Sequence, residues 1–484
     1  MLKIKPLILA TSLTTLLTVP FSSALETNKN ILPDIGAAGF SVLSIDKERL
    51  IGQAMMKQLR ASQPIINDPI LIEYINDLGN RLVKNAKDVN YGFEFFLIRN
   101  KELNAFAFFG GHVGIHSGLI TEADTESELA SVIAHEISHV TQRHMARRLE
   151  SQSQSQVLSM AGLISGVLIS LVNPTVGMAT LMGSMALTQQ AGINYTRANE
   201  KEADRVGIAL LSASKFDPQG APDFFTKMSS KYRYKSSPPP MLLTHPIPSA
   251  RITDARQRAQ NLPTVTLPPT LSFELAKSRI TSRYESDPKI NIARYKLQLD
   301  KKLYVLEEGA KYGLAISYFE NKQYIAAQSI LEPLLAADKN NLFYVDVLSD
   351  IYIALKQFDR GIKMLSKLDL LMPYNQVVTL NYASVLNSAE QDEKAAQMLQ
   401  DFLLVSPGNF IAYDLLTEIY KKQGEVALMH SSKAEILALL GSYSAAIDEL
   451  QTGYRVAKEQ PLLKKRIKAR ILQLQTQEDK LKRL

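Results

Sequence analysis

Apolar residues between positions 129 and 140 recur every three or four residues, which is the period of one face of an α-helix. The apolar positions of this stretch are Leu129, Val132, Ile133, Ile137 and Val140. Polar residues ahead of them supply a start signal, with Asp124 as an N-cap and Thr125 with Glu128 as a capping box. The pattern therefore predicts a helix that begins near residue 125 and continues through residue 140.

A second pattern begins near residue 308, where apolar and small residues repeat with a period of 34 residues. The matching positions are Leu314, Tyr318, Tyr324 and Ala327, then Leu348, Tyr352, Phe358 and Gly361, then Tyr382, Ala383, Ala395 and Pro407. The register then shifts by half a unit, with Leu416, Tyr420 and Gly424 in one helix and Ala434, Gly441, Tyr443 and Ala446 beginning the next pair. This period is typical of tetratricopeptide repeats, and generic amphipathic helix pairs would not keep it. We expect an α-solenoid whose concave face binds peptides or partner proteins.

Two other apolar regions have different characters. Lys3 and Lys5 precede the run 6–19, which is followed by Ser22-Ser23-Ala24. This order is typical of a secretory signal peptide cleaved near Ala24, and the run is too short for a transmembrane anchor. Residues 157–187 form two short apolar runs separated by Asn173-Pro174. We expect a buried helical hairpin or flap there, and a segment that dips into a membrane is the alternative.

Length and composition set the frame for these elements. The chain has 484 residues, more than one ordinary domain, and a proline-rich run at 262–269 marks a boundary. The predicted organisation is a signal peptide (1–24), a first domain (25–262), a helical linker (263–307) and the solenoid (308–484). The chain has no cysteine, which excludes a lipoprotein anchor and a disulfide framework.

The charge pattern limits the partners. The net charge is +7 and the pI about 9.1, but basic residues are spread along the chain. The densest run, 464–470, fits the solvated face of a terminal helix. Nucleic-acid binding needs a focused basic patch, so no nucleic-acid partner is expected. An anionic membrane surface or an acidic partner stays open.

The predicted helix around residue 135 carries the sequence His135-Glu136-Ile137-Ser138-His139. Histidines four residues apart on a helix project from one face, which is the spacing that holds a zinc ion. Glu136 follows the first histidine and is placed to accept a proton from the attacking water. The expected reaction is peptide-bond hydrolysis. The alternative, two ordinary helix histidines, leaves an acidic residue in an apolar run without a reason.

A catalytic zinc site needs a third protein ligand. The metzincin pattern would put a histidine at position 145, which is Met145. A glutamate from a second helix is the other common solution, and Glu200 supplies it. Asp204, one helical turn later, is placed to accept a hydrogen bond from the distal nitrogen of a ligating histidine. Lys201 and Glu202 are predicted to form a solvated surface.

His245 follows the polar, proline-rich run 236–240, which predicts an extended loop. We hypothesise that His245 fills the open coordination position and keeps the enzyme latent until the loop moves. Stabilisation of the oxyanion in the transition state and simple packing are the alternatives. Arg251, Tyr195 and Arg197 are further oxyanion candidates that the sequence does not rank.

These motifs resemble a known metallopeptidase family, that of the HtpX and CAAX-prenyl-protease type. The resemblance is carried by HEISH at 135–139, by E-x-E-A-D-x-x-G at 200–207, by Thr244-His245-Pro246 with Arg251-Ile252, and by the stretch 104–119. It assigns His135, His139 and Glu200 to one zinc ion per chain, Glu136 to general base catalysis and Asp204 to a supporting role.

The stretch 104–119 resembles the strand at the edge of that family's active site. Its β-forming residues are interrupted by Gly110-Gly111, which can mark a turn or a bulge. The residues assigned to the substrate edge are Gly110, Gly111, His112, Val113 and Gly114. A free edge there would hold an extended peptide through backbone hydrogen bonds, with little sequence selectivity. His112 and His116 are expected to point into solvent or polar surroundings.

The order of signal peptide, peptidase domain and repeats resembles the β-barrel assembly-enhancing proteases of the Gram-negative periplasm over nearly the full length. The resemblance implies two roles, which are promoting assembly of outer-membrane β-barrel proteins and degrading those that stall, with the repeats docking onto the barrel assembly machinery. The alternatives are a chaperone or scaffold with a latent zinc site, and a general periplasmic quality-control protease. The predicted fold is mainly α (α+β), a zincin-type domain with a small sheet followed by an α-solenoid.

Overall fold

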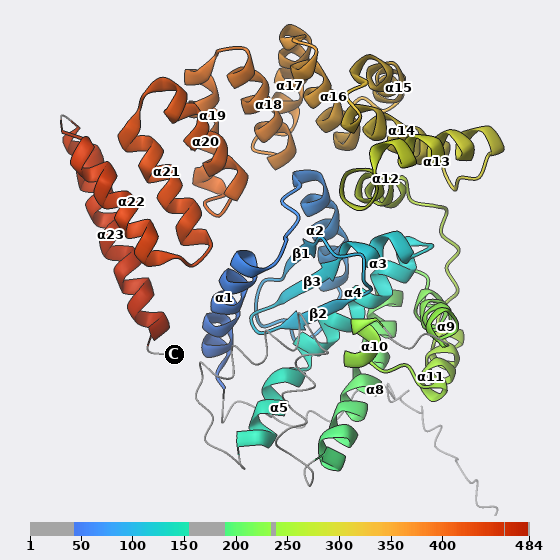
Figure 1. The fold of residues 1–484 in the computed structure, drawn as a ribbon. Helices are drawn as coiled ribbons and strands as arrows, with labels where there is room; N and C mark the ends of the chain where they lie inside the picture. The colour runs from blue at the N-terminus through green and yellow to red at the C-terminus, as the bar shows by residue number, and fades with distance from the viewer. Residues whose placement is uncertain (1–42, 154–188, 234–238, 459, 483–484) are drawn as a thin grey trace, which may run out of the picture.

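The computed structural model describes residues 43–153, 189–233, 239–458 and 460–482 (Figure 1). The N-terminal part is a small sheet surrounded by helices, and the C-terminal part is an arc of helices that curves around it. The predicted signal peptide and the apolar segment 157–187 lie outside the described residues. None of the described helices combines the length and apolar character needed to cross a membrane.

The N-terminal part contains α1 (Ile45–Ser62), α2 (Pro69–Val83), β1 (Glu94–Ile98), β2 (Ala105–Phe108), β3 (His112–His116), α3 (Ser117–Glu122), α4 (Glu126–Thr141), α5 (His144–Ser153), α8 (Gln189–Ala213), α9 (Gly220–Tyr232), α10 (Pro240–Thr244) and α11 (Ser249–Gln260). Helix α4 lies at the centre, in contact with α2, β2, α8 and α9. The histidine-bearing helix is therefore enclosed on several sides by other elements.

The helix predicted around residue 135 is confirmed as α4. Thr125 is its N-cap, and the Thr125 hydroxyl accepts a hydrogen bond from the Glu128 amide at 3.2 Å. The Glu128 carboxylate accepts one from the Asp124 amide at 2.8 Å, so the predicted capping-box residues do bond to the start of the helix. Nearly every side chain of α4 is buried, His135 among them, and the exception is His139, whose side chain is 16% exposed.

The sheet corrects one prediction. Its strand order is β1-β3-β2, with β3 parallel to β1 and antiparallel to β2, so His112, Val113 and Gly114 lie in the central strand and offer no free edge. Gly110 and Gly111, with φ of 81° and 83°, form the tight turn between β2 and β3. The prediction failed because a single strand pattern does not show what pairs on its other side. Among the described residues, no strand pairs with the outer edge of β2, and β2 is in contact with α4.

His112 and His116 are buried, and each has a polar partner. The His112 ring lies 3.1 Å from the Glu94 carboxylate, and Nδ1 of His116 lies 3.2 Å from the Glu102 carbonyl oxygen. Both belong to the packing of the sheet, consistent with the polar surroundings expected for them but not with exposure to solvent.

The C-terminal part contains α12 (Leu271–Ile280), the π-helix η1 (Thr281–Glu285), α13 (Pro288–Lys301), α14 (Glu307–Glu320), α15 (Tyr324–Ala337), α16 (Leu342–Ala354), α17 (Phe358–Leu371), α18 (Gln376–Ser388), α19 (Asp392–Val405), α20 (Phe410–Gln423), α21 (Val426–Leu439), α22 (Tyr443–Val456) and α23 (Pro461–Lys482). Helices α15, α17 and α19 begin at 324, 358 and 392, which confirms the period of 34 residues. The fold is a helical solenoid, as predicted.

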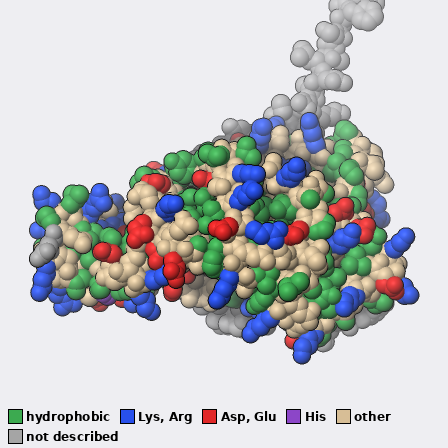
Figure 2. All heavy atoms as spheres, turned by 90° about the horizontal axis from the view of Figure 1, so that it is seen from above, with side chains coloured by type: hydrophobic (Ala, Val, Ile, Leu, Met, Phe, Trp, Pro, Cys, Tyr) green, Lys and Arg blue, Asp and Glu red, His purple; other side chains and the backbone are tan. Residues whose placement is uncertain are grey.

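Small residues let the repeat helices pack closely. Ala327 and Ala395 are fully buried, and a Cβ at Gly361 would lie 3.1 Å from the Val385 side chain. The last pairs close the arc on the N-terminal part, where Lys57 of α1 lies 4.8 Å from the centre of the Tyr443 ring. Seen from above in Figure 2, Lys and Arg side chains are spread between hydrophobic and acidic ones, which agrees with the charge pattern of the sequence.

A buried arginine joins the two parts. Arg279 of α12 is 1% exposed and forms ion pairs of 2.6 Å with Asp68, the N-cap of α2, and with Asp346 of α16. Burial raises the pKa of Asp68, but the charges of Arg279 and Arg283 outweigh burial and hold the pKa below its ordinary value. One hydrophobic cluster also runs from Ile66 to Val377. The segment 263–307, predicted as a linker, thus contains helices packed against both parts.

Replacing Arg279 with leucine should destabilise the fold by about 3–5 kcal/mol, because Asp68 and Asp346 would stay buried without their partner. Denaturant unfolding measures this, with the exposed Arg294→Leu as a control expected within about 0.5 kcal/mol of wild type. The difference in unfolding free energy between wild type and R279L should be full at pH values above the ordinary pKa of aspartate, about 3.9. It should shrink at lower pH, because protonation of Asp68 removes the ion pair from wild type as well. Equal stabilities of R279L and wild type at neutral pH would contradict this role.

Candidate metal centre

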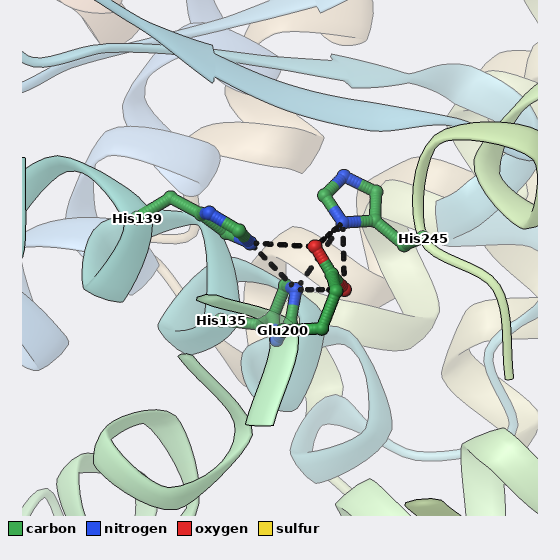
Figure 3. A group of neighbouring side chains, drawn as sticks. All are labelled: His135, His139, Glu200 and His245. Carbon is green, nitrogen blue, oxygen red and sulfur yellow. Dashed lines mark hydrogen bonds and ion pairs between the residues drawn. The ribbon is translucent and has the colours of Figure 1, made fainter. Parts of the chain in front are cut away.

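Two helices and a loop bring four side chains together. His135 and His139 project from α4 and Glu200 projects from α8 (Figure 3). His245 is the residue that caps the C-terminus of α10. The four ligand atoms all lie within 4.8 Å of one another. The residues predicted for zinc, and the predicted fourth candidate, therefore share one site.

Three of the distances between ligand atoms are close to those of a tetrahedral zinc site, and all four ligand atoms lie within 4.8 Å. Nε2 of His135 lies 3.0 Å from Nε2 of His139 and 3.4 Å from a Glu200 oxygen, and Nδ1 of His245 lies 3.4 Å from Nε2 of His135. Ligands placed about 2.0–2.1 Å from zinc at tetrahedral corners are about 3.3–3.4 Å apart. Imidazole nitrogens and a carboxylate oxygen are also zinc's usual donors, so the residues present fit this metal.

The close approach of α8 to α4 depends on Gly207. A Cβ at this position would lie 3.1 Å from the His135 amide nitrogen and 3.2 Å from its Cα, tighter than most side chains permit. Gly207 lies seven residues after Glu200, on the same face of α8. Its lack of a side chain lets Glu200 reach the histidines. The glycine was part of the sequence motif, but only the helix packing shows its purpose.

Asp204 holds the back of His135. Its carboxylate lies 3.0 Å from Nδ1 of His135 and accepts two hydrogen bonds of 2.7 Å from Arg251. Burial raises the pKa of Asp204, but the hydrogen bonds from His135 and Arg251 outweigh burial and lower it. The carboxylate therefore stays charged, in the position predicted for it.

Arg251 is engaged by the site's carboxylates. Besides Asp204, its guanidinium pairs with Glu200 at 2.9 Å and donates to the Pro246 carbonyl at 2.7 Å. This arrangement places it behind the ligands, not at a substrate oxyanion. Arg197 is exposed on α8, and the side chain of Tyr195 lies outside the described residues.

Glu136 is the carboxylate beside the cluster. It is 1% exposed, and its Oε1 has no hydrogen bond from any described residue. The nearest charged partner is Nε2 of His245, 3.6 Å away. Arg251 pairs with Glu200 and Asp204, and Glu136 adds a third buried carboxylate beside the histidines, a concentration of acidic groups that favours a cation. An unbonded carboxylate oxygen is available to accept a proton.

Sequence reasoning assigned no role to His144 and treated Glu202 as solvated surface. The structure places His144 at 2.8 Å from His139 and at 3.1 Å from Glu202. The Glu202 side chain is only 23% exposed, which corrects the surface prediction. The only sequence signal was a histidine five residues after a zinc ligand, which is not a one-face helix spacing. A break in the helix brings the two rings together.

Comparison with known proteins agrees with this geometry. The model of peptidase family M48 matches residues 69–259. A putative beta-barrel assembly-enhancing protease of Vibrio cholerae serotype O1 is 42% identical over 93% of each chain. The beta-barrel assembly-enhancing proteases of Yersinia pestis and Escherichia coli K12 are 39% and 38% identical, over 95% of this chain and 96% and 94% of theirs. A solved structure of MamA aligns with 33% of this chain and 95% of its own at 17% identity, with a TM-score of 0.23 that is too low to bear on the fold.

The packing of α8 on α4 gives a test of the site. Gly207→Val should lower zinc retention by about tenfold or more, because the added side chain meets the His135 backbone and moves Glu200 away from the histidines. Zinc bound per chain after dialysis against a weak chelator measures this. Gly92→Val is the matched control, since a Cβ at Gly92 meets nothing within 4 Å. Equal zinc retention in G207V and G92V would contradict the packing argument.

Proposed function

The chain belongs to peptidase family M48 and, within it, to the beta-barrel assembly-enhancing proteases, and from this premise we propose that it cleaves outer-membrane β-barrel proteins that stall and promotes the assembly of the others. It is a metalloprotease, and its cofactor is one zinc ion per chain. The observation that carries the proposal is the buried cluster of His135, His139 and Glu200 with the unbonded carboxylate of Glu136 beside it.

The proposed roles follow from these positions. His135, His139 and Glu200 hold the zinc ion, which when bound supplies Lewis-acid activation of water and of the scissile carbonyl. Glu136 accepts the proton of the attacking water and later gives it to the leaving amine. Asp204 accepts a hydrogen bond from the Nδ1–H group of His135 and keeps that ring oriented, and Arg251 holds Asp204 in place.

The substrate is proposed to lie along β2. The outer edge of this strand has no partner strand among the described residues, and the strand itself contacts α4, the helix of the zinc histidines. An extended peptide there would be held by its backbone, so cleavage would depend little on sequence. The segment that carries His245 meets this edge at one end, because the Met241 amide donates to the Leu103 carbonyl at 3.2 Å.

His245 is proposed to be a latch. Nδ1 of His245 lies 3.0 Å from Oε1 of Glu200, so the cluster has four protein donors. A catalytic zinc site keeps its fourth position for water or substrate, whereas a site closed by four protein ligands is inactive. Movement of α10 and its loop would open both the fourth position and the upstream end of the β2 edge.

The repeats are proposed to dock onto the barrel assembly machinery. Leu370 and Leu404 lie one repeat apart at the ends of α17 and α19 and are 84% and 82% exposed, which supports contact with another protein. The proposed location is the periplasm, after cleavage of residues 1–24. The proposed domain limits are 25–262, 263–307 and 308–484.

Two other functions are weighed against this one. The closed set of four donors favours a chaperone or scaffold with a latent zinc site as the second candidate. A general periplasmic quality-control protease would use the same chemistry without barrel clients. Crosslinking from the exposed leucines of the repeats tests the proposal against the general protease. The proposal requires capture of barrel-assembly components, whereas a general protease would capture unrelated periplasmic proteins.

Glu136→Gln should reduce cleavage of an unfolded outer-membrane β-barrel protein by about 10²–10⁴-fold, because glutamine cannot accept the proton of the attacking water. Zinc content should be unchanged, since Glu136 is not a ligand. The rate of cleavage by the mature protein, with metal content determined in both forms, measures this. If wild type and His245→Ala both hold zinc and neither cleaves such a substrate, the chaperone function is the better account.

His245→Ala should raise basal cleavage by about 5–150-fold, the range that a coupling of 1–3 kcal/mol gives. The reason is that the fourth coordination position becomes free for water and substrate. Single-turnover cleavage of the same substrate measures it, and His430→Ala, a histidine of the repeats, is the control. Unchanged or lower cleavage by H245A would rule out the latch.

A further inference from the structure

The second zinc histidine is held from behind by residues that the proposed mechanism does not use. We infer that His144 is a positioning residue that fixes the ring of His139, and that Glu202 and Arg147 in turn hold His144. The inference deepens the proposed function and rests on it, since it takes His139 to be a zinc ligand.

A helix break brings His144 into place. Helix α4 ends at Thr141, Arg143 adopts the left-handed conformation with φ of 52°, and α5 begins at His144. Arg143 is buried and anchored to α1, donating to the Glu48 carboxylate at 3.0 Å and to the Leu43 carbonyl at 2.7 Å. These bonds hold a conformation that is rare for a residue with a side chain. The helix is interrupted there, and His144 lies beside His139.

The contacts form a chain that leads away from the metal cluster. Nδ1 of His139 lies 2.8 Å from Nδ1 of His144, and Nε2 of His144 lies 3.1 Å from a Glu202 oxygen. Arg147 donates to the same Glu202 oxygen at 2.6 Å. His139 meanwhile directs Nε2 toward the cluster, 3.4 Å from Glu200. Each ring nitrogen of both histidines therefore has at least one partner.

The protons have one distribution that satisfies every contact with neutral rings. A histidine that binds metal through Nε2 carries its proton on Nδ1, so His139 donates and Nδ1 of His144 accepts. His144 then carries its proton on Nε2 and donates it to Glu202. The ion pair between Glu202 and Arg147, 2.6 Å apart, makes the Glu202 carboxylate a fitting acceptor.

The arrangement parallels the one behind His135. There, Nδ1 contacts Asp204 directly, and Arg251 locks the carboxylate. Behind His139, the ring of His144 lies between His139 and the Glu202 carboxylate, and Arg147 forms an ion pair with Glu202. Glu200, Glu202 and Asp204 all lie on α8, so one helix supplies a zinc ligand and the carboxylates that orient both histidines.

His144 does not serve as a metal ligand in this geometry. Both of its nitrogens are engaged, one by the rear nitrogen of His139 and one by Glu202. The metal-holding group found among the described residues contains His135, His139, Glu200 and His245, without His144. Its effect on zinc is therefore exerted through His139.

The test is the rate at which the mature full-length protein releases zinc to a chromogenic chelator. His144→Ala should release zinc about 10–100-fold faster than wild type, the usual effect of removing a residue that orients a metal ligand. His144→Asn should recover much of the loss, because its amide oxygen stands near the position of Nδ1 and accepts the same proton. A residue that merely fills space would not distinguish the two variants.

Two further variants complete the test. Glu202→Ala should also speed the release of zinc. Because Glu202 is partly exposed, its replacement should leave the fold intact, so this variant replaces H144A in the test if H144A does not fold. His430→Asn is the matched control, a histidine 2.6 Å from Glu449 in the repeats, and should release zinc at the wild-type rate. The inference would be overturned if folded H144A and E202A release zinc at the wild-type rate. It would also be overturned if H144N releases zinc as fast as folded H144A. Either result would leave the proposed function standing. A wild-type chain that takes up no zinc would overturn the proposed function as well.

Discussion

The metal centre depends on how closely α8 packs against α4. The two helices meet where Gly207 faces the backbone of His135, and a side chain there would lie about as close as atoms tolerate. This one contact sets the distance between Glu200 and the histidines. It also sets the distance from Asp204 to His135 and from Glu202 to His144, because all three carboxylates lie on α8. Helix packing thus decides the ligand geometry and the support behind it together.

Buried charge imposes a second constraint, and arginines meet it. Carboxylates taken out of water are costly unless they are paired and hydrogen-bonded. Arg251 pairs with Asp204 and Glu200 in the metal centre. Arg279 does the same for Asp68 and Asp346, and in doing so ties the first domain to the repeats. Together with the contact between Lys57 and Tyr443, this makes the solenoid a part of the folded body. A partner bound to the repeats therefore acts on an element that is packed against the peptidase core.

The proposed site combines a candidate base with four candidate protein donors for the metal. Glu136 keeps an unbonded oxygen beside the metal position, which suits a base, while His245 stands where water and substrate would enter. A closed site protects a protease from unselective cleavage, which matters when a substrate is held mainly by its backbone. The segment of His245 also contacts the residues just before β2. One movement of this segment would therefore open both the fourth coordination position and the proposed substrate edge of β2.

Much of this protein is determined by local sequence. The period of α4, its capping box, the HEISH spacing and the 34-residue repeat are patterns within one or two helices, where backbone geometry alone relates residue number to position. Glu200, Asp204 and His245 were also found from sequence, because their motifs resemble those of a family. The tertiary structure decided the rest, namely the central place of β3, the engagement of Arg251, the contact between His144 and His139 and the junction at Arg279. These relations depend on which surfaces pack together over long separations, or on a break in a helix, and no spacing along the chain encodes them.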